Sequence, residues 1–406
     1  MTYLKVLRGK TAWGETKPSI FLVLNTFVWF TLTNAIFNAI LNGLNLFETE
    51  KLSLFAVYFM SIAASAVFGS KFFSRARANL LYFWLFMGAT VTSFLITISS
   101  SDILADVLLA IFLGISIGIG FPSCLSYFAD STHIENRGFI GGITWSGVGF
   151  AVLFLAVLFS GLAVWEAIAV LAIWRLLGGF GFVFLTRQNQ KPNVQKSLSY
   201  SELVRKREIL LYLFPWIMFS LINFAEEPLL ERVFGSAVFA FVGPAEYAFI
   251  GVFAVVGGIV ADVVGRKRVV ITGFVMLGIE YAVLSSGSPA TLYLFMTLDG
   301  VTWGLFSSVF LTAIWGDLGE GHQKEKYYVL GGLPFLLASF VSILISPYAS
   351  HILLTAAFSL ASFFLFLAVI PLMYAPETLP EKTIRDRELN QYIEQAKKAK
   401  EKYAKS

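Results

Sequence analysis

The chain has 406 residues, of which 57% are hydrophobic and 14% are charged, and its mean hydropathy is +0.74. Soluble domains carry about 25% charged residues, so this composition excludes a water-soluble fold. The single cysteine, Cys124, excludes an internal disulfide, and the three histidines are too few and too scattered for a metal site. We therefore predict neither a metal nor a cofactor.

Apolar segments of about 20 residues recur along the chain, and each is long enough to cross a bilayer core of about 30 Å. The segments are continuous rather than alternating, which excludes a membrane β-barrel and leaves helices. The sequence predicts an all-α membrane protein with twelve transmembrane helices, at residues 20–42, 52–70, 79–99, 103–128, 138–160, 163–186, 209–230, 237–261, 268–286, 290–315, 326–347 and 350–374.

The basic residues are distributed unevenly between the two sides of these spans. With twelve spans both termini share one side, and 27 of the 30 lysines and arginines fall on that side. The positive-inside rule assigns such a side to the cytoplasm. The polar start of the chain has no cleavage site, so the first span is predicted to be retained. We predict a multi-pass protein of the cell membrane with both termini in the cytoplasm.

The chain is predicted to consist of two similar halves. Residues 74–77 read Ser-Arg-Ala-Arg and residues 265–268 read Gly-Arg-Lys-Arg, an offset of 191 that is about half the chain and indicates a duplicated unit of six spans. The predicted organisation is a cytoplasmic N-terminal segment, a six-helix bundle, a basic cytoplasmic linker, a second six-helix bundle and a cytoplasmic tail, at residues 1–19, 20–186, 187–208, 209–375 and 376–406. The tail is either a short helix or a solvated end.

One motif joins the eighth and ninth spans. Gly258 is followed by Asp262, then by Gly265, and then by the basic residues Arg266, Lys267 and Arg268. A glycine lets a neighbouring helix approach, an aspartate can cap a helix N-terminus, and a second glycine permits a tight turn. The basic residues can anchor this turn at the membrane surface.

This motif is similar to the signature of the major facilitator superfamily, in which an aspartate follows a glycine by four residues and precedes Gly-Arg-Arg/Lys. The span number, the division into six and six, the basic linker and the Pro-Glu-Thr sequence at 376–378 also fit this family over nearly the whole chain. The first half departs from it, because Val67, Lys71 and Ser74 replace the glycine, the aspartate and the later glycine. The matching contact in the first half therefore stays open.

The resemblance implies a cytoplasmic gate made of ion pairs between loops. Carried over to this chain, Arg266 or Arg268 pairs with Asp317. In the first half, Arg75 or Arg77 pairs with Asp130 at the end of the fourth span. The alternative is that the basic residues only fix the topology and contact anionic lipid headgroups.

Seven charged residues lie within the spans, and those that face the cavity are the candidates for substrate binding and coupling. A charge at bilayer depth costs about 2.5 to 3.5 kcal/mol or more, so each should face a cavity or a partner. They are Glu166, Arg175, Glu226, Glu227, Glu246, Glu280 and Asp299. Asp299 and Glu246 are predicted to lie near the midplane. Because the resemblance implies that the first, fourth, seventh and tenth spans line the cavity, Asp299 with Glu226 or Glu227 is favoured. A carboxyl in such a place can bind and release a proton, although Glu226 and Glu227 could instead be wetted at an outer vestibule.

Two further features mark candidate residues. Thr31, Asn34, Asn38 and Asn42 share one face of the first span, which either lines the cavity or bonds a neighbouring helix. Trp303 follows Asp299 by four residues and could wall the same pocket, although aromatic side chains more often serve packing. Pro228 is expected to break the seventh span after Glu227.

Arg175 lies in the middle of the sixth span and needs an anionic partner. Glu166 is nine residues earlier on the same helix and faces the opposite way, so the two cannot pair. Arg175 needs an anionic ligand, a carboxylate from another span, or water, and a structural pairing is favoured over substrate binding. Glu280, in the peripheral ninth span, is interpreted in the same way.

The chain lacks the motifs of a nucleotide-binding loop, a metalloprotease or a serine hydrolase, so no enzymatic activity is expected. We predict a secondary active transporter that moves a small solute by alternating access between two bundles. The acidic excess within the spans favours proton coupling and a neutral or cationic solute. The alternative is a non-transporting sensor or scaffold with the same fold. The expected partners are a small-molecule substrate, the lipid bilayer and protons, with no nucleic acid, and a monomer is expected.

Overall fold

The computed structural model describes residues 13–72, 77–98, 102–186, 197–286 and 291–380, together with residues 383–385, 389 and 393. All elements in these ranges are helical. Eleven helical segments of the described chain are long and apolar enough to cross a membrane. The ninth predicted span is the 19-residue helix α12 (Arg266–Leu284), which begins with three basic residues and also carries Glu280. The described fold therefore agrees with the predicted series of spans.

The helices of the first half are α2 (Trp13–Gly43), α3 (Glu48–Phe72), α4 (Arg77–Ser93) with η2 (Phe94–Thr97), α5 (Ile103–Gly118) with α6 (Phe121–Asp130), α7 (Arg137–Phe159) and α8 (Val164–Leu185). The helices of the second half are α10 (Arg207–Phe234), α11 (Ser236–Val264), α12, α13 (Thr291–Phe306) with η3 (Ser307–Ile314) and α14 (Trp315–Leu318), α15 (Glu325–Ile345) with η4 (Ser346–His351), and α16 (Leu354–Tyr374).

Two of the predicted spans are internally divided. The fourth contains two α-helices, because α5 ends at Gly118 and α6 begins at Phe121 with Pro122 in its first turn. The tenth changes to a π-helix over η3 before α14. A π-helical segment often lies at a functional site.

The expected break at Pro228 is wrong. α10 continues through both Pro215 and Pro228 to Phe234. Proline is tolerated within membrane helices because neighbouring groups satisfy the freed backbone atoms. Pro228 nevertheless removes the hydrogen-bond donor of the Phe224 carbonyl, one turn earlier, beside the cavity described below.

The predicted linker contains one more helix. α9 (Tyr200–Arg205) begins at a capping box, in which Ser199 Oγ accepts the Glu202 N–H and the Glu202 carboxylate accepts the Ser199 N–H at 2.7 Å. α10 starts at Arg207, within the predicted linker. Residues 187–196 and most of the predicted tail lie outside the described residues.

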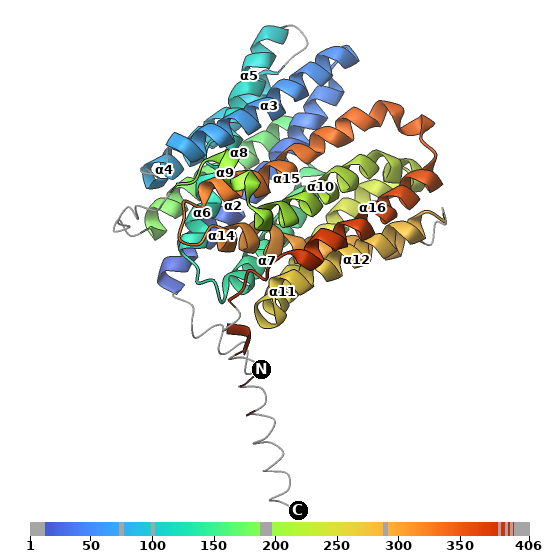
Figure 1. Cartoon of the computed structure of the whole chain (residues 1–406). Coiled ribbons are helices and arrows are strands. Elements are labelled where there is room, and N and C mark those ends of the chain that lie inside the picture. Colours follow the sequence, from blue (N-terminus) through green and yellow to red (C-terminus); the bar gives the residue numbers. More distant parts are fainter. Residues whose placement is uncertain are drawn as a thin grey trace, which may run out of the picture.

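Helix contacts recur from one half to the other, and Figure 1 shows one of them, α12 beside α16. The contacts of α2 with α8, α4 with α8 and α3 with α5 in the first half correspond to those of α10 with α16, α12 with α16 and α11 with α13 in the second. Each pair lies six spans after its counterpart. This pattern is what a duplicated six-helix unit would produce.

The halves meet where α7 packs against α11 and η3, and where α15 packs against α3 and α6. Glycine permits the first approach, because a Cβ atom on Gly142 would lie 2.5 Å from the Ala254 carbonyl oxygen and one on Gly149 would lie 2.6 Å from the Tyr247 carbonyl oxygen. Gly258 faces the Gly138 backbone still more closely. Small residues at these positions therefore bring the two backbones into direct contact.

We call the end of the bundle where α2 begins and α16 ends the terminal end, and the opposite end the distal end. Thr16 Oγ1 donates to the Ser131 carbonyl at 3.1 Å, and Lys267 Nζ donates to the Met373 carbonyl at 2.7 Å. These bonds join the start of α2 to the end of α6, and the start of α12 to the end of α16.

Candidate functional site

A cavity of about 420 Å³ lies between the two halves. Helices α2, α3 and α7 line it from the first half, and α10, α11, α13, η3 and α15 line it from the second. Its lining extends to Asn38, Leu230 and Ile343, close to the distal ends of α2, α10 and α15. We call it the central cavity. Its volume is within the range of small-molecule sites, about 300 to 1,000 Å³.

Three of the predicted carboxylates line the central cavity: Glu227, Glu246 and Asp299. Asp299 is only 2% exposed, and its Oδ1 has no hydrogen-bond partner among the described residues. Asn223 of α10 and Ser342 of α15 line the cavity together with these carboxylates, and Asn223 Nδ2 donates to Tyr281 Oη at 3.2 Å. The seventh and tenth spans thus both contribute, as the resemblance implied, and α11 adds Glu246.

Two other carboxylates lie behind the cavity wall rather than in its lining. Glu226 is 3% exposed and Glu280 is 1% exposed, and both interact electrostatically with Asp299. Neither carboxyl oxygen of Glu280 has a hydrogen-bond partner among the described residues. The structural pairing expected for Glu280 is therefore not found there, and α12 instead directs this residue toward the other carboxylates.

Among the described residues, no group of three or more His, Cys, Asp or Glu side chains could hold a metal ion. The cavity presents the carboxyl groups of Glu227, Glu246 and Asp299 to a solute.

The polar face of α2 divides between the cavity and its rim. Thr31, Asn34 and Asn38 line the cavity, and Asn34 Oδ1 accepts a hydrogen bond from Tyr58 Oη at 2.6 Å. Asn42 instead donates to Asn38 Oδ1 at 2.9 Å in an exposed position. Both alternatives for this face thus apply, because the same residue lines the cavity and bonds a neighbouring helix.

Aromatic rings form the walls of the cavity. Trp303 lines it together with Trp145 and Phe335, and the rings of Trp303 and Phe335 have centroids 5.9 Å apart. Phe219 lies behind Trp303, at 4.9 Å between centroids. The placement of Trp303 near Asp299 agrees with the predicted shared pocket.

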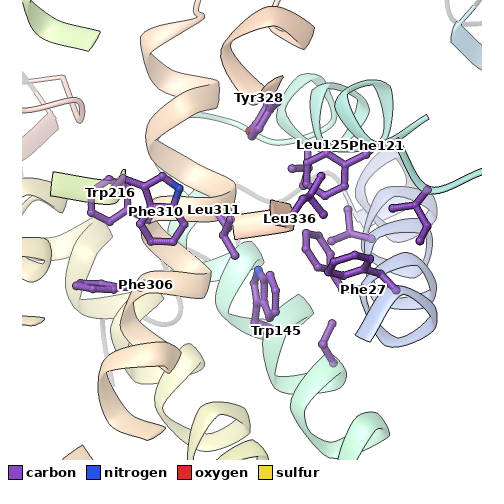
Figure 2. Close-up of a cluster of buried hydrophobic side chains, with 14 of the residues drawn as sticks. Phe27, Phe121, Leu125, Trp145, Trp216, Phe306, Phe310, Leu311, Tyr328 and Leu336 are labelled. Atoms are coloured by element: carbon purple, nitrogen blue, oxygen red, sulfur yellow. The ribbon is translucent and has the colours of Figure 1, made fainter. Parts of the chain in front are cut away.

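On the terminal side of these rings, hydrophobic side chains from both halves pack together (Figure 2). Phe27 of α2 lies 4.5 Å from Trp145 and 6.2 Å from Phe335, measured between ring centroids. Leu125 and Leu336 are both fully buried in this cluster. We call this cluster the floor, and its members shown in Figure 2 are Phe27, Phe121, Leu125, Trp145, Trp216, Phe306, Phe310, Leu311, Tyr328 and Leu336.

Ion pairs within the second half and between the two halves cover the terminal side of the floor. Asp317 pairs with both Arg137 of α7 and Arg266 of α12. Asp262 contacts Arg266 at 3.2 Å and accepts the N–H groups of Gly138 and Phe139 at 3.1 and 2.7 Å. Asp262 therefore caps the N-terminus of α7, a helix of the opposite half.

A second group of ion pairs lies beside the first. Arg77 contacts Asp130 at 2.6 Å and Glu325 at 2.5 Å, and Lys324 contacts Asp130 at 2.8 Å. Burial alone would lower the pKa of Arg77, but the carboxylates of Glu325 and Asp130 outweigh it and raise that pKa. Arg77 thus stays charged and links the two halves. We call both groups together the terminal network, made of Arg77, Asp130, Arg137, Asp262, Arg266, Asp317, Lys324 and Glu325.

The structure selects among the predicted gate pairs. Arg266, not the exposed Arg268, contacts Asp317. Arg77 contacts Asp130, and Arg75 lies outside the described residues. The prediction missed Lys324 and Glu325, although both stand in the loop after Asp317.

The end of the chain beyond α16 supports the motif turn. Gly265 has a φ of +105°, so a side chain there would be strained. Glu377 accepts the backbone N–H groups of Arg266 and Lys267 at 2.9 and 3.2 Å, which caps α12. Thr378 Oγ1 donates to Asp317 at 3.1 Å.

Arg175 is fully buried but lies outside the cavity lining. Its guanidinium lies over the rings of Trp29 and Trp84, 4.1 and 4.4 Å from their centroids. It donates to Asn25 Oδ1 at 2.9 Å and to Thr26 Oγ1 at 3.1 Å. Within the described part of the chain it has no carboxylate partner, so cation–π contacts and neutral oxygens replace the expected ion pair.

Two bundles, a cavity between them and ion pairs at one end together define this fold. Among solved structures, the chain is similar to the "human organic anion transporter MFSD10 (TETRAN)", with a TM-score of 0.65 at 15% identity, over 89% of this chain and 100% of that one. No protein-family model matches the chain, and no curated protein matches it in sequence. The similarity establishes the fold.

Proposed function

We propose that this protein is a secondary active transporter that moves a small solute by alternating access. The observation that carries this proposal is the asymmetry of the space between the halves. The central cavity extends to the distal end, whereas the floor and the terminal network fill the terminal end. A solute in the cavity would reach the other side after the halves rock apart at the terminal end.

The distribution of basic residues supports a cytoplasmic terminal end. On this orientation the cavity opens away from the cytoplasm, and the terminal network is the closed cytoplasmic gate. Asp262, Arg266 and Asp317 then hold the gate on one side, and Arg77 and Asp130 hold it on the other. We place the protein in the cell membrane, with the solute, lipid and protons as its partners and with no enzymatic role.

The carboxylates support proton coupling. Asp299 lies in the wall of the cavity and interacts with Glu226, Glu246 and Glu280. Several negative charges close together in a nonpolar region are unfavourable, and a proton bound to one of them relieves the repulsion. A proton can thus be taken up in one conformation and released in the other.

The test is a thermal-shift screen of the purified full-length protein over small solutes at two pH values, followed by flux measurements in proteoliposomes with the solute that binds best. In Asp299→Asn we expect transport to continue at a reduced rate and to lose its dependence on a pH gradient. Glu166→Gln is the matched control, because Glu166 lies outside the cavity lining and bonds the Ala163 N–H.

Unchanged pH dependence in Asp299→Asn would contradict proton coupling through this residue. Saturable binding without flux of any solute that binds would contradict transport, and would favour a sensor or scaffold with the same fold.

A further inference from the structure

The charges of the central cavity point to the class of its solute, on the basis of the proposed transport function. Glu227, Glu246 and Asp299 line it, and no described residue of the lining is a lysine, arginine or histidine. An anion in this space would face three carboxyl groups without a compensating positive charge. A cation would be attracted to them, and more strongly than in water because the walls are nonpolar.

A second observation is the unsatisfied oxygen of Asp299. The residue lines the cavity, is 2% exposed, and its Oδ1 has no hydrogen-bond partner in the described part of the chain. Buried polar atoms in proteins are normally hydrogen-bonded. A hydrogen-bond donor or a positively charged group on the solute would compensate this oxygen.

The walls supply the third observation. Trp145, Trp303 and Phe335 line the same cavity and offer aromatic surface from both halves. An ammonium group is attracted to the face of an aromatic ring, with Trp the strongest partner. The same rings bury the nonpolar body of a solute, so charge and hydrophobic contact are provided together.

The basic residues near the bundle core do not offset these carboxylates. Arg175 lies outside the lining and is held between Trp29 and Trp84. Arg232, near the distal end of α10, donates to the carbonyls of Ala349 and Ile352 at 2.8 and 3.0 Å. The similar solved structure is that of an organic anion transporter. In the cavity of this chain, no described lining residue is basic and could pair with an anion.

We propose that the central cavity binds an organic cation with an aromatic or otherwise hydrophobic body, with Asp299 and Glu246 as the anionic groups and Trp145, Trp303 and Phe335 as the walls. The cavity volume of about 420 Å³ suits an ion of organic size.

Protons compete with such a cation for the same carboxylates. The groups around Asp299 are Glu226, Glu227, Glu246, Glu280 and Tyr281, and Asn223 contacts it. Every carboxylate among them loses its charge as the pH falls. The affinity for a cation whose own charge is permanent should therefore decrease in acid, and its binding should release protons.

The experiment measures binding to the purified full-length protein by calorimetry. The probes are phenyltrimethylammonium, which is a permanent cation, and benzenesulfonate, which has the same ring and the opposite charge. We expect the cation to bind at least about tenfold more tightly than the anion, which corresponds to about 1.4 kcal/mol. We also expect its affinity to fall as the pH is lowered.

Two variants test the residues. Asp299→Asn and Glu246→Gln should each weaken binding of the cation by about tenfold or more and reduce proton release in a weakly buffered solution. Glu166→Gln, which removes a carboxylate outside the lining, should leave both unchanged. Melting temperatures of all variants identify any that have lost the fold. Because Asp299 and Glu246 are changed in separate variants, the test remains valid if one of the two variants is poorly folded.

The outcomes separate this inference from the proposed function. Tighter binding of benzenesulfonate, equal binding of both ions, or no binding of either would overturn the cation class, whereas proteoliposome flux of another solute would still support transport. Binding of the cation without flux would support the cation site and contradict transport.

Discussion

The sharpest perturbation of the terminal network is Asp317→Asn. Asp317 pairs with Arg137 and Arg266, and also accepts a hydrogen bond from Thr378 at 3.1 Å. The Asp317 side chain is 0% exposed, and the two arginine side chains are 1% and 0% exposed. The asparagine has nearly the same shape but no charge, so both arginines would lose an anionic partner while remaining buried.

The structure allows the size of the effect to be worked out. Removing one partner of a buried ion pair costs about 3 to 5 kcal/mol, because a buried charge is left uncompensated. Asp262 still contacts Arg266 at 3.2 Å, so the lower value applies. The cost falls on the conformation closed at the terminal end, since opening brings water to the arginines. About 3 kcal/mol changes the ratio of open to closed molecules roughly 100-fold.

Maleimide labelling of a cysteine in the floor can measure this change. Leu125 is fully buried between the halves, so Leu125→Cys in a Cys124→Ser background should react slowly. Adding Asp317→Asn should raise the labelling rate roughly 100-fold. The control is Glu320→Gln. Glu320 contacts Arg137 at 3.4 Å, but its side chain is 54% exposed, and such pairs contribute at most about 1 kcal/mol.

An unchanged labelling rate in Asp317→Asn would refute the view that this carboxylate holds the terminal end closed. An equal increase in Glu320→Gln would refute the argument from burial, because it would show that any charge removed from this end has the same effect.

Two further substitutions test the contacts that align the motif. Gly258→Ala should lower the melting temperature of the purified protein, because the new Cβ atom would collide with the Gly138 carbonyl. Gly43→Ala is the control, since its Cβ atom would meet nothing within 4 Å. Equal melting temperatures of the two variants would contradict this close approach. Glu377→Ala should increase labelling of the floor cysteine several-fold, because it leaves the N–H groups of Arg266 and Lys267 without their cap, which contributes about 1 kcal/mol in total. Labelling at the rate of the unsubstituted reporter protein would show that this cap does not stabilise the closed end.

The spans could be predicted from the sequence because the membrane requires long apolar helices, and this requirement is visible in residues such as those of α8 and α16. The side of each helix that faces the cavity could not. In a soluble helix the polar face marks the solvent, but in these spans the faces toward lipid and toward protein are both apolar. Glu280 was therefore interpreted as a peripheral residue, whereas it lies buried near Asp299.

The ion pairs show a similar limit. The resemblance supplied Arg266 with Asp317 and Arg77 with Asp130, and the structure contains both contacts. It did not supply Arg77 with Glu325, because several loops carry charges of both signs and the sequence does not show that the start of α4 lies near the start of α15. Arg175 shows the reverse case, since a search for a carboxylate partner overlooked the rings of two tryptophans.

The terminal network and the cavity carboxylates have opposite roles in the proposed cycle, because only the terminal network contains positive charges beside its negative ones. In the terminal network carboxylates contact arginines and a lysine, and opening replaces those partners with water, which partly offsets their loss. The cavity carboxylates have no such partners. Closing the distal end over Glu227, Glu246 and Asp299 while they are ionised would remove several like charges from water together, which is strongly unfavourable. A bound proton or cation removes that obstacle. The terminal end can therefore open with the cavity empty, whereas the distal end can close only over an occupied or protonated cavity. This difference would prevent the proposed transporter from completing its cycle without a bound solute or proton.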